Sequence, residues 1–262
     1  MDAGLLEQQV ASLEEGRGFL DASRLLAVEV SGADAEGWLN DLLTANVRGI
    51  AVGTAEGSLL LSPTGRVRAD VHVWRALDGF VLVQDDRQPA PIDELLAPYV
   101  LSSHVRLRRL GSETPFVLIR SGKGGWEVRD APPAGASRVE GDAGEAWRIR
   151  RGLPRFPVDI DQDSLPAEAA LDRLIDEDKG CFLGQEAVAK VRNLGHPARV
   201  VLALKADGVV GPGDRVLTRD EDVGSVTSAT PVDTGTALLA RVRWDARRAP
   251  LHTSSGRTLE PA

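Results

Sequence analysis

The clearest pattern along the chain is an alternation of apolar and polar residues over positions 66–74. The apolar positions are Val67, Ala69, Val71 and Val73. A strand shows this pattern when one face covers a core and the other meets solvent or a cavity. The alternation therefore predicts a strand whose polar face includes Asp70, joined by a turn at residues 63–65 to a strand over 57–61.

Other segments predict a mixture of strands and helices. Strands are expected at 24–30, 79–84, 104–110, 116–119 and 145–151. Helical spacing is found at 34–43, 91–100, 167–175 and 184–192. From residue 197 onward, four short apolar segments separated by Gly, Pro and Asp turns predict a small antiparallel barrel or sandwich. These segments are 200–204, 215–218, 224–228 and 237–244.

Size and charge restrict the class of protein. A chain of 262 residues is long for one domain, so we expect two or three compact units. The net charge of −8 disfavours a general nucleic-acid binder, although a local basic groove stays open. No secretory leader and no apolar run of membrane-spanning length is visible, so we expect a cytoplasmic protein that does not bind membranes.

The chain has a single cysteine, Cys181. One cysteine excludes an intramolecular disulfide and a four-cysteine metal or iron–sulfur site within one chain. The histidines also lack metal-ligand spacing, so no metal site is predicted. Cys181 follows Lys179 and Gly180 in a loop that leads into a predicted helix. A lysine and a helix start both favour the thiolate form, whereas the alternative is a small packed residue.

The segment from Lys179 to Lys190 reads K-G-C-F-x-G-Q-E-x-x-x-K. It resembles the signature of the YgfZ family of folate-binding proteins. That family assists iron–sulfur protein maturation and is related to the T protein (aminomethyltransferase) of the glycine cleavage system. Weaker resemblance to family motifs is found at residues 32–35 with Thr44 and Asn46, and at 62–73, 151–160 and 224–228.

The resemblance implies an α+β fold of three subdomains around a central cavity that holds a reduced folate. The first subdomain would be discontinuous, formed by residues 1–50 and 151–196. Residues 51–150 would form a ferredoxin-like α+β middle domain, and residues 197–262 a C-terminal antiparallel β-barrel.

Two positions depart from the T-protein pattern. Its pair of adjacent aspartates aligns with Ala69 and Asp70, and the loss of one acid argues against aminomethyl transfer. Its E-A-G turn, whose glutamate contacts the pterin ring, reads Arg150-Arg151-Gly152 here. The second change predicts weakened or lost folate binding, or an anionic ligand beside Arg150.

The resemblance and the local pattern together assign site residues. Asp70 would accept hydrogen bonds from the ligand, and Trp74 would lie beside the pterin. Lys179 would support the Cys181 thiolate or hold the glutamate tail of folate. Gln185 and Glu186 would line the site at the helix start. We expect Asp70, Lys179 and residues 184–186 to face one shared pocket.

The function this implies is a folate-binding accessory protein for iron–sulfur cluster assembly or repair, with tetrahydrofolate or a derivative as cofactor and iron–sulfur client or assembly proteins as partners. Whether such a protein is also an enzyme stays open. One alternative is a tetrahydrofolate-dependent aminomethyl or methyl transferase, in which Asp70 matters more than Cys181. Another is a non-catalytic scaffold that has lost its ligand.

Overall fold

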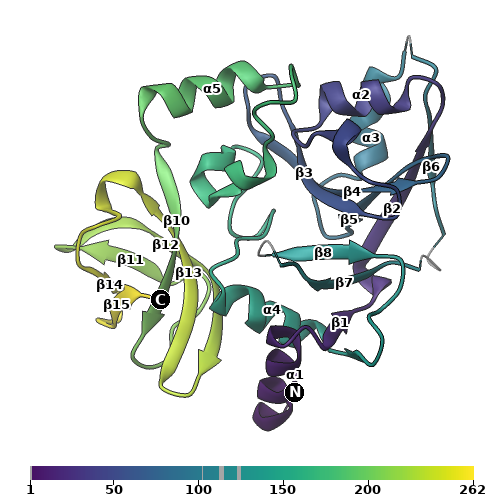
Figure 1. Ribbon diagram of the computed structural model, residues 1–262. Coiled ribbons are helices and arrows are strands. Elements are labelled where there is room, and N and C mark those ends of the chain that lie inside the picture. Colours follow the sequence, from purple (N-terminus) through teal and green to yellow (C-terminus); the bar gives the residue numbers. More distant parts are fainter. Residues whose placement is uncertain (1, 102, 112–114, 123–124) are drawn as a thin grey trace.

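The largest sheet of the chain is antiparallel and has five strands in the order β3-β4-β5-β2-β6, shown at the upper right of Figure 1. The computed structural model describes residues 2–101, 103–111, 115–122 and 125–262. The strands are β2 (Leu25–Ser31), β3 (Ala55–Leu61), β4 (Val67–Ala76), β5 (Gly79–Asp85) and β6 (Arg106–Arg109).

Helices α2 (Ala35–Leu42) and α3 (Ile92–Leu96) cover one face of this sheet. Ala69, Val71 and Val73 of β4 are fully buried beneath them, as the alternation predicts. Val67 is buried as well, but it packs into a different cluster with Phe156. The ladder between β3 and β4 shifts register at Leu60 and Leu61, next to the hairpin turn, and so ends the simple alternation there.

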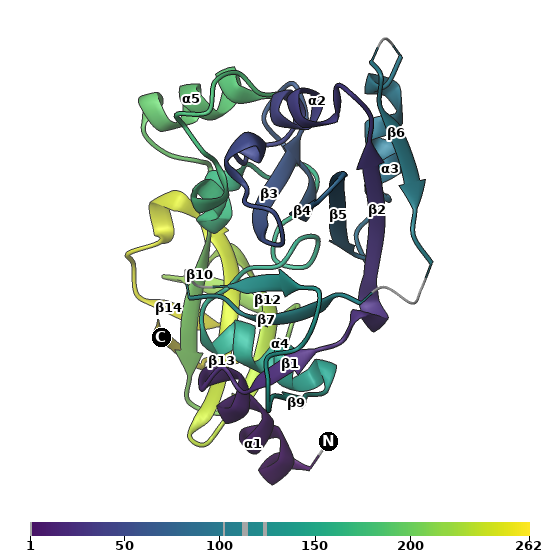
Figure 2. The same ribbon diagram turned by 45° about the vertical axis from the view of Figure 1, so that its right-hand side comes forward.

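A second sheet lies against the opposite face and has the order β8-β7-β1-β9. Its strands are β1 (Gly18–Leu20), β7 (Val117–Arg120), β8 (Trp126–Arg129) and β9 (Ser137–Arg138). Figure 2 shows β1 continuing into β2, so that the first part of the chain enters both sheets. Residues 1–50 and 51–150 therefore contribute strands to the same two sheets, and the expected division between them stays a prediction.

Helices α1 (Ala3–Glu14) and α4 (Gly141–Arg150) pack on one another below this sheet. The strand predicted at 145–151 is wrong, because residues 145–150 form the second half of α4. Trp147 and Ile149 alternate with arginines, which is the pattern of a strand with one buried face. The pattern misleads because Arg148 is itself buried, with 3% of its side chain exposed, and α4 is covered on more than one side.

Residues 151–184 cross the molecule without a long element and pack on β3 through Phe156, Ile160, Leu171 and Phe182. The helix predicted at 167–175 is two 3₁₀ turns, η4 (Pro166–Ala169) and η5 (Leu171–Leu174). Helix α5 (Gln185–Leu194) follows and confirms the predicted helix. Further 3₁₀ turns are η1 (Ala22–Arg24), η2 (Val47–Gly49), η3 (Ala97–Tyr99) and η6 (Trp244–Ala246).

The C-terminal part forms a closed barrel in the order β10-β13-β12-β11-β14-β15, with β15 pairing back to β10. Closure removes free sheet edges and confirms the predicted barrel. Its strands are β10 (Arg199–Ala206), β11 (Arg215–Thr218), β12 (Glu221–Val232), β13 (Gly235–Arg243), β14 (Leu251–Thr253) and β15 (Thr258–Pro261). Among the described helices, none has the length and apolar character needed to span a bilayer.

Candidate functional site

The polar face of β4 carries Asp70 and His72, on the side of the sheet away from α2. Burial raises the pKa of the Asp70 carboxyl, and nearby Asp85 adds to this effect. The positive charges of His72 and Arg173 oppose it. A ring nitrogen of His72, Nε2, lies 3.1 Å from the carbonyl oxygen of Trp126 in β8. Asp70 is thus a half-buried acid whose proton is held more tightly than usual.

Adjacent side chains of a strand point to opposite faces of the sheet, so residues 69 and 70 of β4 do not share a face. Ala69 is fully buried in the core beneath α2, whereas Asp70 is on the other face. An aspartate at position 69 would enter that core and would not lie beside Asp70. The alanine therefore does not remove an acid from the polar face of β4.

Lys179 anchors the Cys181 loop to the end of α2. Its Nζ donates to the carbonyl oxygen of Leu43 at 2.5 Å and to that of Asn40. A cation at a helix C-terminus satisfies orphan carbonyls and interacts favourably with the helix dipole. Burial nevertheless lowers the pKa of Lys179 to about 8, opposed by the charges of Asp41 and Asp176.

Cys181 is exposed in this loop. On either side of it the loop is fixed: Lys179 binds α2, and Phe182 is buried against β3. Gly184 has φ +84°, and a Cβ there would lie 2.5 Å from the carbonyl oxygen of Ser62. Glycine at 184 therefore lets the loop press against the turn between β3 and β4. The described contacts of Lys179 go to two carbonyl oxygens and to the ring of Phe182, whose centroid lies 5.4 Å from Nζ, and do not include the thiol.

The polar contacts do not bring Asp70 and Lys179 together. The charges that act on Asp70 belong to His72, Arg173 and Asp85, and those that act on Lys179 belong to Asp41, Asp176 and Arg48. Gln185 is partly buried and Glu186 is exposed at the start of α5. The single pocket expected to unite these residues stays a prediction.

Two expected ligand contacts have other partners. Trp74 is buried between the two sheets, where its ring meets that of Phe116 edge to face at 5.6 Å. Arg150 donates to both carboxylate oxygens of Glu7 in α1, at 2.8 and 2.6 Å, and to the carbonyl oxygen of Pro231 at 3.0 Å. The anionic ligand expected beside Arg150 stays a prediction, and Glu7 already supplies an anion to this guanidinium.

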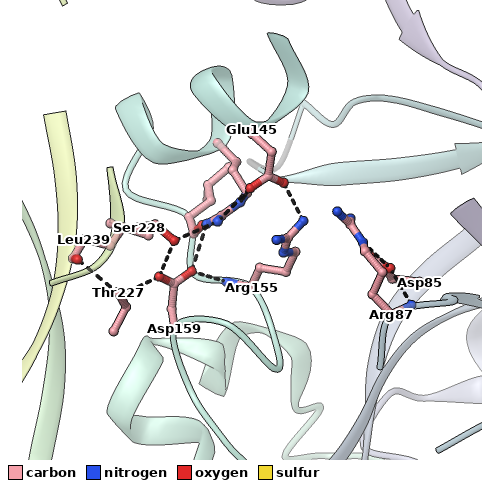
Figure 3. Close-up of polar contacts among 10 residues, drawn as sticks. Asp85, Arg87, Glu145, Arg155, Asp159, Thr227, Ser228 and Leu239 are labelled. Carbon is pink, nitrogen blue, oxygen red and sulfur yellow. Dashed lines mark hydrogen bonds and ion pairs between the residues drawn. The ribbon is translucent and has the colours of Figure 1, made fainter. Parts of the chain in front are cut away.

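Sequence reasoning missed a buried polar centre at Asp159, where α4 meets the barrel (Figure 3). Asp159 has no exposed side-chain surface and accepts from Arg148 at 2.8 Å, from Thr227 at 2.6 Å and from Ser228 at 2.7 Å. The backbone N–H of Arg155 adds a bond of 2.9 Å. An arginine between Trp147 and Ile149 was the available signal, because arginines are rarely buried unless paired.

A further set of charges continues from this centre toward β5. Arg155 donates to Glu145 at 2.6 Å, and Arg87, just after β5, binds both carboxylate oxygens of Asp85 at 2.8 and 2.5 Å. Separately, a pocket of about 300 Å³ lies between residues 157–161 and the barrel strands β12 and β13. Neither Asp70 nor Cys181 lines that pocket.

Comparison with known proteins places this geometry in context. Residues 3–109 match the family described as GCVT N-terminal domain. The aminomethyltransferase of Streptomyces avermitilis is 24% identical over 294 aligned positions, covering 88% of this chain and 79% of that protein. The mitochondrial iron–sulfur cluster assembly factor IBA57 homolog of Cryptococcus neoformans is 25% identical over 240 positions, covering 68% of this chain and 63% of that protein.

Among solved structures, the glycine cleavage system aminomethyltransferase T from Bartonella henselae superposes with a TM-score of 0.78 at 18% identity, covering 97% of this chain and 88% of that one. Fold and matched domain define the class: this is a protein of the T-protein fold with a GCVT N-terminal domain. Within that class, the segment between Lys179 and Lys190 resembles the signature of the YgfZ family.

Proposed function

We propose that this protein is a folate-dependent accessory factor in iron–sulfur cluster assembly or repair, and that it acts through Cys181. The observation that carries the proposal is an exposed thiol in a loop that is fixed on both sides. A fixed loop presents its thiol to a partner without first being ordered, which lowers the entropy cost of the encounter. Similarity to an iron–sulfur cluster assembly factor supports the same role.

The partners proposed for this thiol are iron–sulfur client or assembly proteins. Iron–sulfur clusters are commonly held by about four protein ligands, and this chain has one cysteine. Cys181 would therefore contact a cluster only together with ligands from a partner chain or an added thiol, or would act as a redox thiol.

Tetrahydrofolate or a derivative is the proposed cofactor, with Asp70 as its polar contact. Asp70 is half-buried on a sheet face that also carries His72, and the charge of Arg173 acts on its carboxyl group. A buried carboxyl is able to accept hydrogen bonds from ring N–H groups and, when protonated, to donate one. Similarity to aminomethyltransferases across most of the chain supports a ligand at this face.

A second candidate is a tetrahydrofolate-dependent one-carbon transferase, and Asp70 favours it. An acid whose pKa is raised by burial is suited to general acid–base catalysis. The position of Ala69 in the core removes the main sequence argument against this activity. The two candidates differ in which side chain is indispensable: Cys181 for the accessory factor, Asp70 for the transferase.

Two measurements on the purified protein test the proposal. Calorimetric titration with tetrahydrofolate should give binding that Asp70→Asn weakens by about tenfold. Asp222→Asn, which alters an exposed ion pair with Arg215, is the matched control and should leave affinity unchanged. Iodoacetamide should label Cys181 in the native protein as completely as in the unfolded chain. Absence of tetrahydrofolate binding together with a protected thiol would contradict the proposal.

A further inference from the structure

Two arginines from different parts of the fold point toward one another in Figure 3. Arg87 follows β5 of the large sheet, and Arg155 follows α4 on the barrel side. Their side chains are 42% and 21% exposed, so neither is sealed from solvent. Each is backed by one carboxylate, Asp85 behind Arg87 and Glu145 behind Arg155.

Both guanidinium groups keep unused donors. Arg87 donates from Nε and Nη2 to Asp85, and Arg155 donates from Nη1 to Glu145. In the part of the chain that the structure describes, no acceptor is recorded for Nη1 of Arg87 or Nη2 of Arg155, and Nε of Arg155 is buried without a partner. A buried donor without an acceptor is costly, so Nε of Arg155 in particular is set up for an acceptor from outside the chain.

The two facing guanidinium groups favour an anion as that acceptor. Burial lowers the pKa of Arg155, and the positive charges of Arg148 and Arg87 act in the same direction, while Glu145 and Asp85 oppose them. Guanidinium groups form their strongest bonds with carboxylate and phosphate oxygens, which match their fork of donors.

We propose that Arg87 and Arg155 together form a binding site for an oxyanion, a carboxylate or a phosphate, held between the large sheet and the α4 side of the molecule. The two arginines belong to different parts of the fold, the large sheet and the segment after α4. An anion bound by both would therefore also hold these two parts together. Its ligand would be either a free inorganic anion or the acidic end of a larger molecule. The inference stands on the arginine pair and does not require the proposed function.

Inorganic phosphate tests the free-anion source. Titrated calorimetrically into the full chain at low ionic strength, phosphate should bind, and Arg87→Gln and Arg155→Gln should each weaken binding by about tenfold or more. Arg155→Lys, which keeps the charge but loses the fork, should give an intermediate affinity. Arg108→Gln is the control, because Arg108 is exposed on β6 and paired with Glu29 outside this junction.

The second arm tests the acidic end of a larger ligand and uses tetrahydrofolate beside tetrahydropteroate, which lacks the glutamate. If the arginines hold those carboxylates, tetrahydrofolate binds more tightly, and both arginine variants abolish the difference. Either arm succeeding supports the oxyanion site. Phosphate affinity and the tetrahydrofolate advantage both being unchanged, or absent, in folded Arg87→Gln and Arg155→Gln proteins would overturn it. Failure of folate binding alone leaves the phosphate arm decisive.

Discussion

The Asp159 centre and the Cys181 loop use polar residues in opposite ways. Asp159 is wholly buried, and each of its oxygens accepts hydrogen bonds from protein donors, including Arg148 and Ser228. Cys181 is exposed, although residues on both sides of it are fixed by Lys179 and Phe182. The difference separates architecture from activity: polar groups that satisfy one another join the parts of the fold, and a reactive group on an anchored loop is left for a partner.

The largest effect is expected at the buried centre. Asp159→Ala should reduce the free energy of unfolding by about 3–5 kcal/mol, because it leaves Arg148 buried with Glu145 as its remaining charged partner and takes the acceptor away from Thr227 and Ser228. Urea denaturation followed by circular dichroism measures the change. Asp222→Ala removes an exposed ion pair with Arg215 and should have little effect. Equal losses of unfolding free energy in the two variants would mean that the buried Asp159 centre stabilises the fold no more than an exposed ion pair does.

The anchoring of the loop is tested at its glycines. Gly184→Ala should destabilise the protein by about 1–3 kcal/mol, because it adds backbone strain at φ +84° and a clash with the carbonyl oxygen of Ser62. Gly180→Ala is a matched control, since its φ is +98° but no atom lies within 4 Å of a new Cβ. Urea denaturation should show a larger loss of unfolding free energy for Gly184→Ala than for Gly180→Ala, and the difference measures the contact with the turn. A smaller loss there than at Gly180 would count against the contact.

Arg150 distinguishes a structural ion pair from a ligand contact. Arg150→Glu should cost about 1 kcal/mol or less, because the new acid faces Glu7 near the surface. Its affinity for tetrahydrofolate should equal that of the unmodified protein. Tighter binding by the variant, measured by calorimetry, would instead restore the contact with the pterin that the sequence suggested.

The smallest effect concerns the pH dependence of the Lys179 anchor. Because burial lowers its pKa in the folded state to about 8, the unfolded chain holds the proton more strongly. Stability contributed by this residue should therefore rise as the pH increases from about 8 toward the usual lysine range. The free energy of unfolding, compared with that of Lys179→Met at pH 7 and pH 9.5, should change in favour of the unmodified chain. A change in the other direction would mean that its two carbonyl contacts outweigh burial.

The sequence predicted what depends on local periodicity. The polar face of β4, the helix after Cys181 and the antiparallel strands of the C-terminal part all follow from short patterns, which left open whether those strands form a barrel or a sandwich. The partners of Lys179 could not be predicted, because backbone carbonyls at Asn40 and Leu43 carry no sequence signature and lie more than 130 residues away in the chain.

Helix α4 was predicted as a strand for a related physical reason. Its charged residues are spaced like those of an exposed strand face, but one of them, Arg148, is buried in an ion pair with Asp159. The same tertiary pairing explains Arg150, which alignment placed beside a ligand and the fold places against Glu7. Long-range charge pairing is thus what the local pattern could not supply.

The activity of iron–sulfur enzymes in cells that carry Cys181→Ser in place of the natural chain tests the central claim most directly. Because the thiol is exposed, the serine variant should keep its unfolding free energy and its tetrahydrofolate affinity. The account predicts that client activity falls severalfold with Cys181→Ser and less with Asp70→Asn. Full client activity with Cys181→Ser and a collapse with Asp70→Asn would contradict it and identify the protein as a one-carbon transferase.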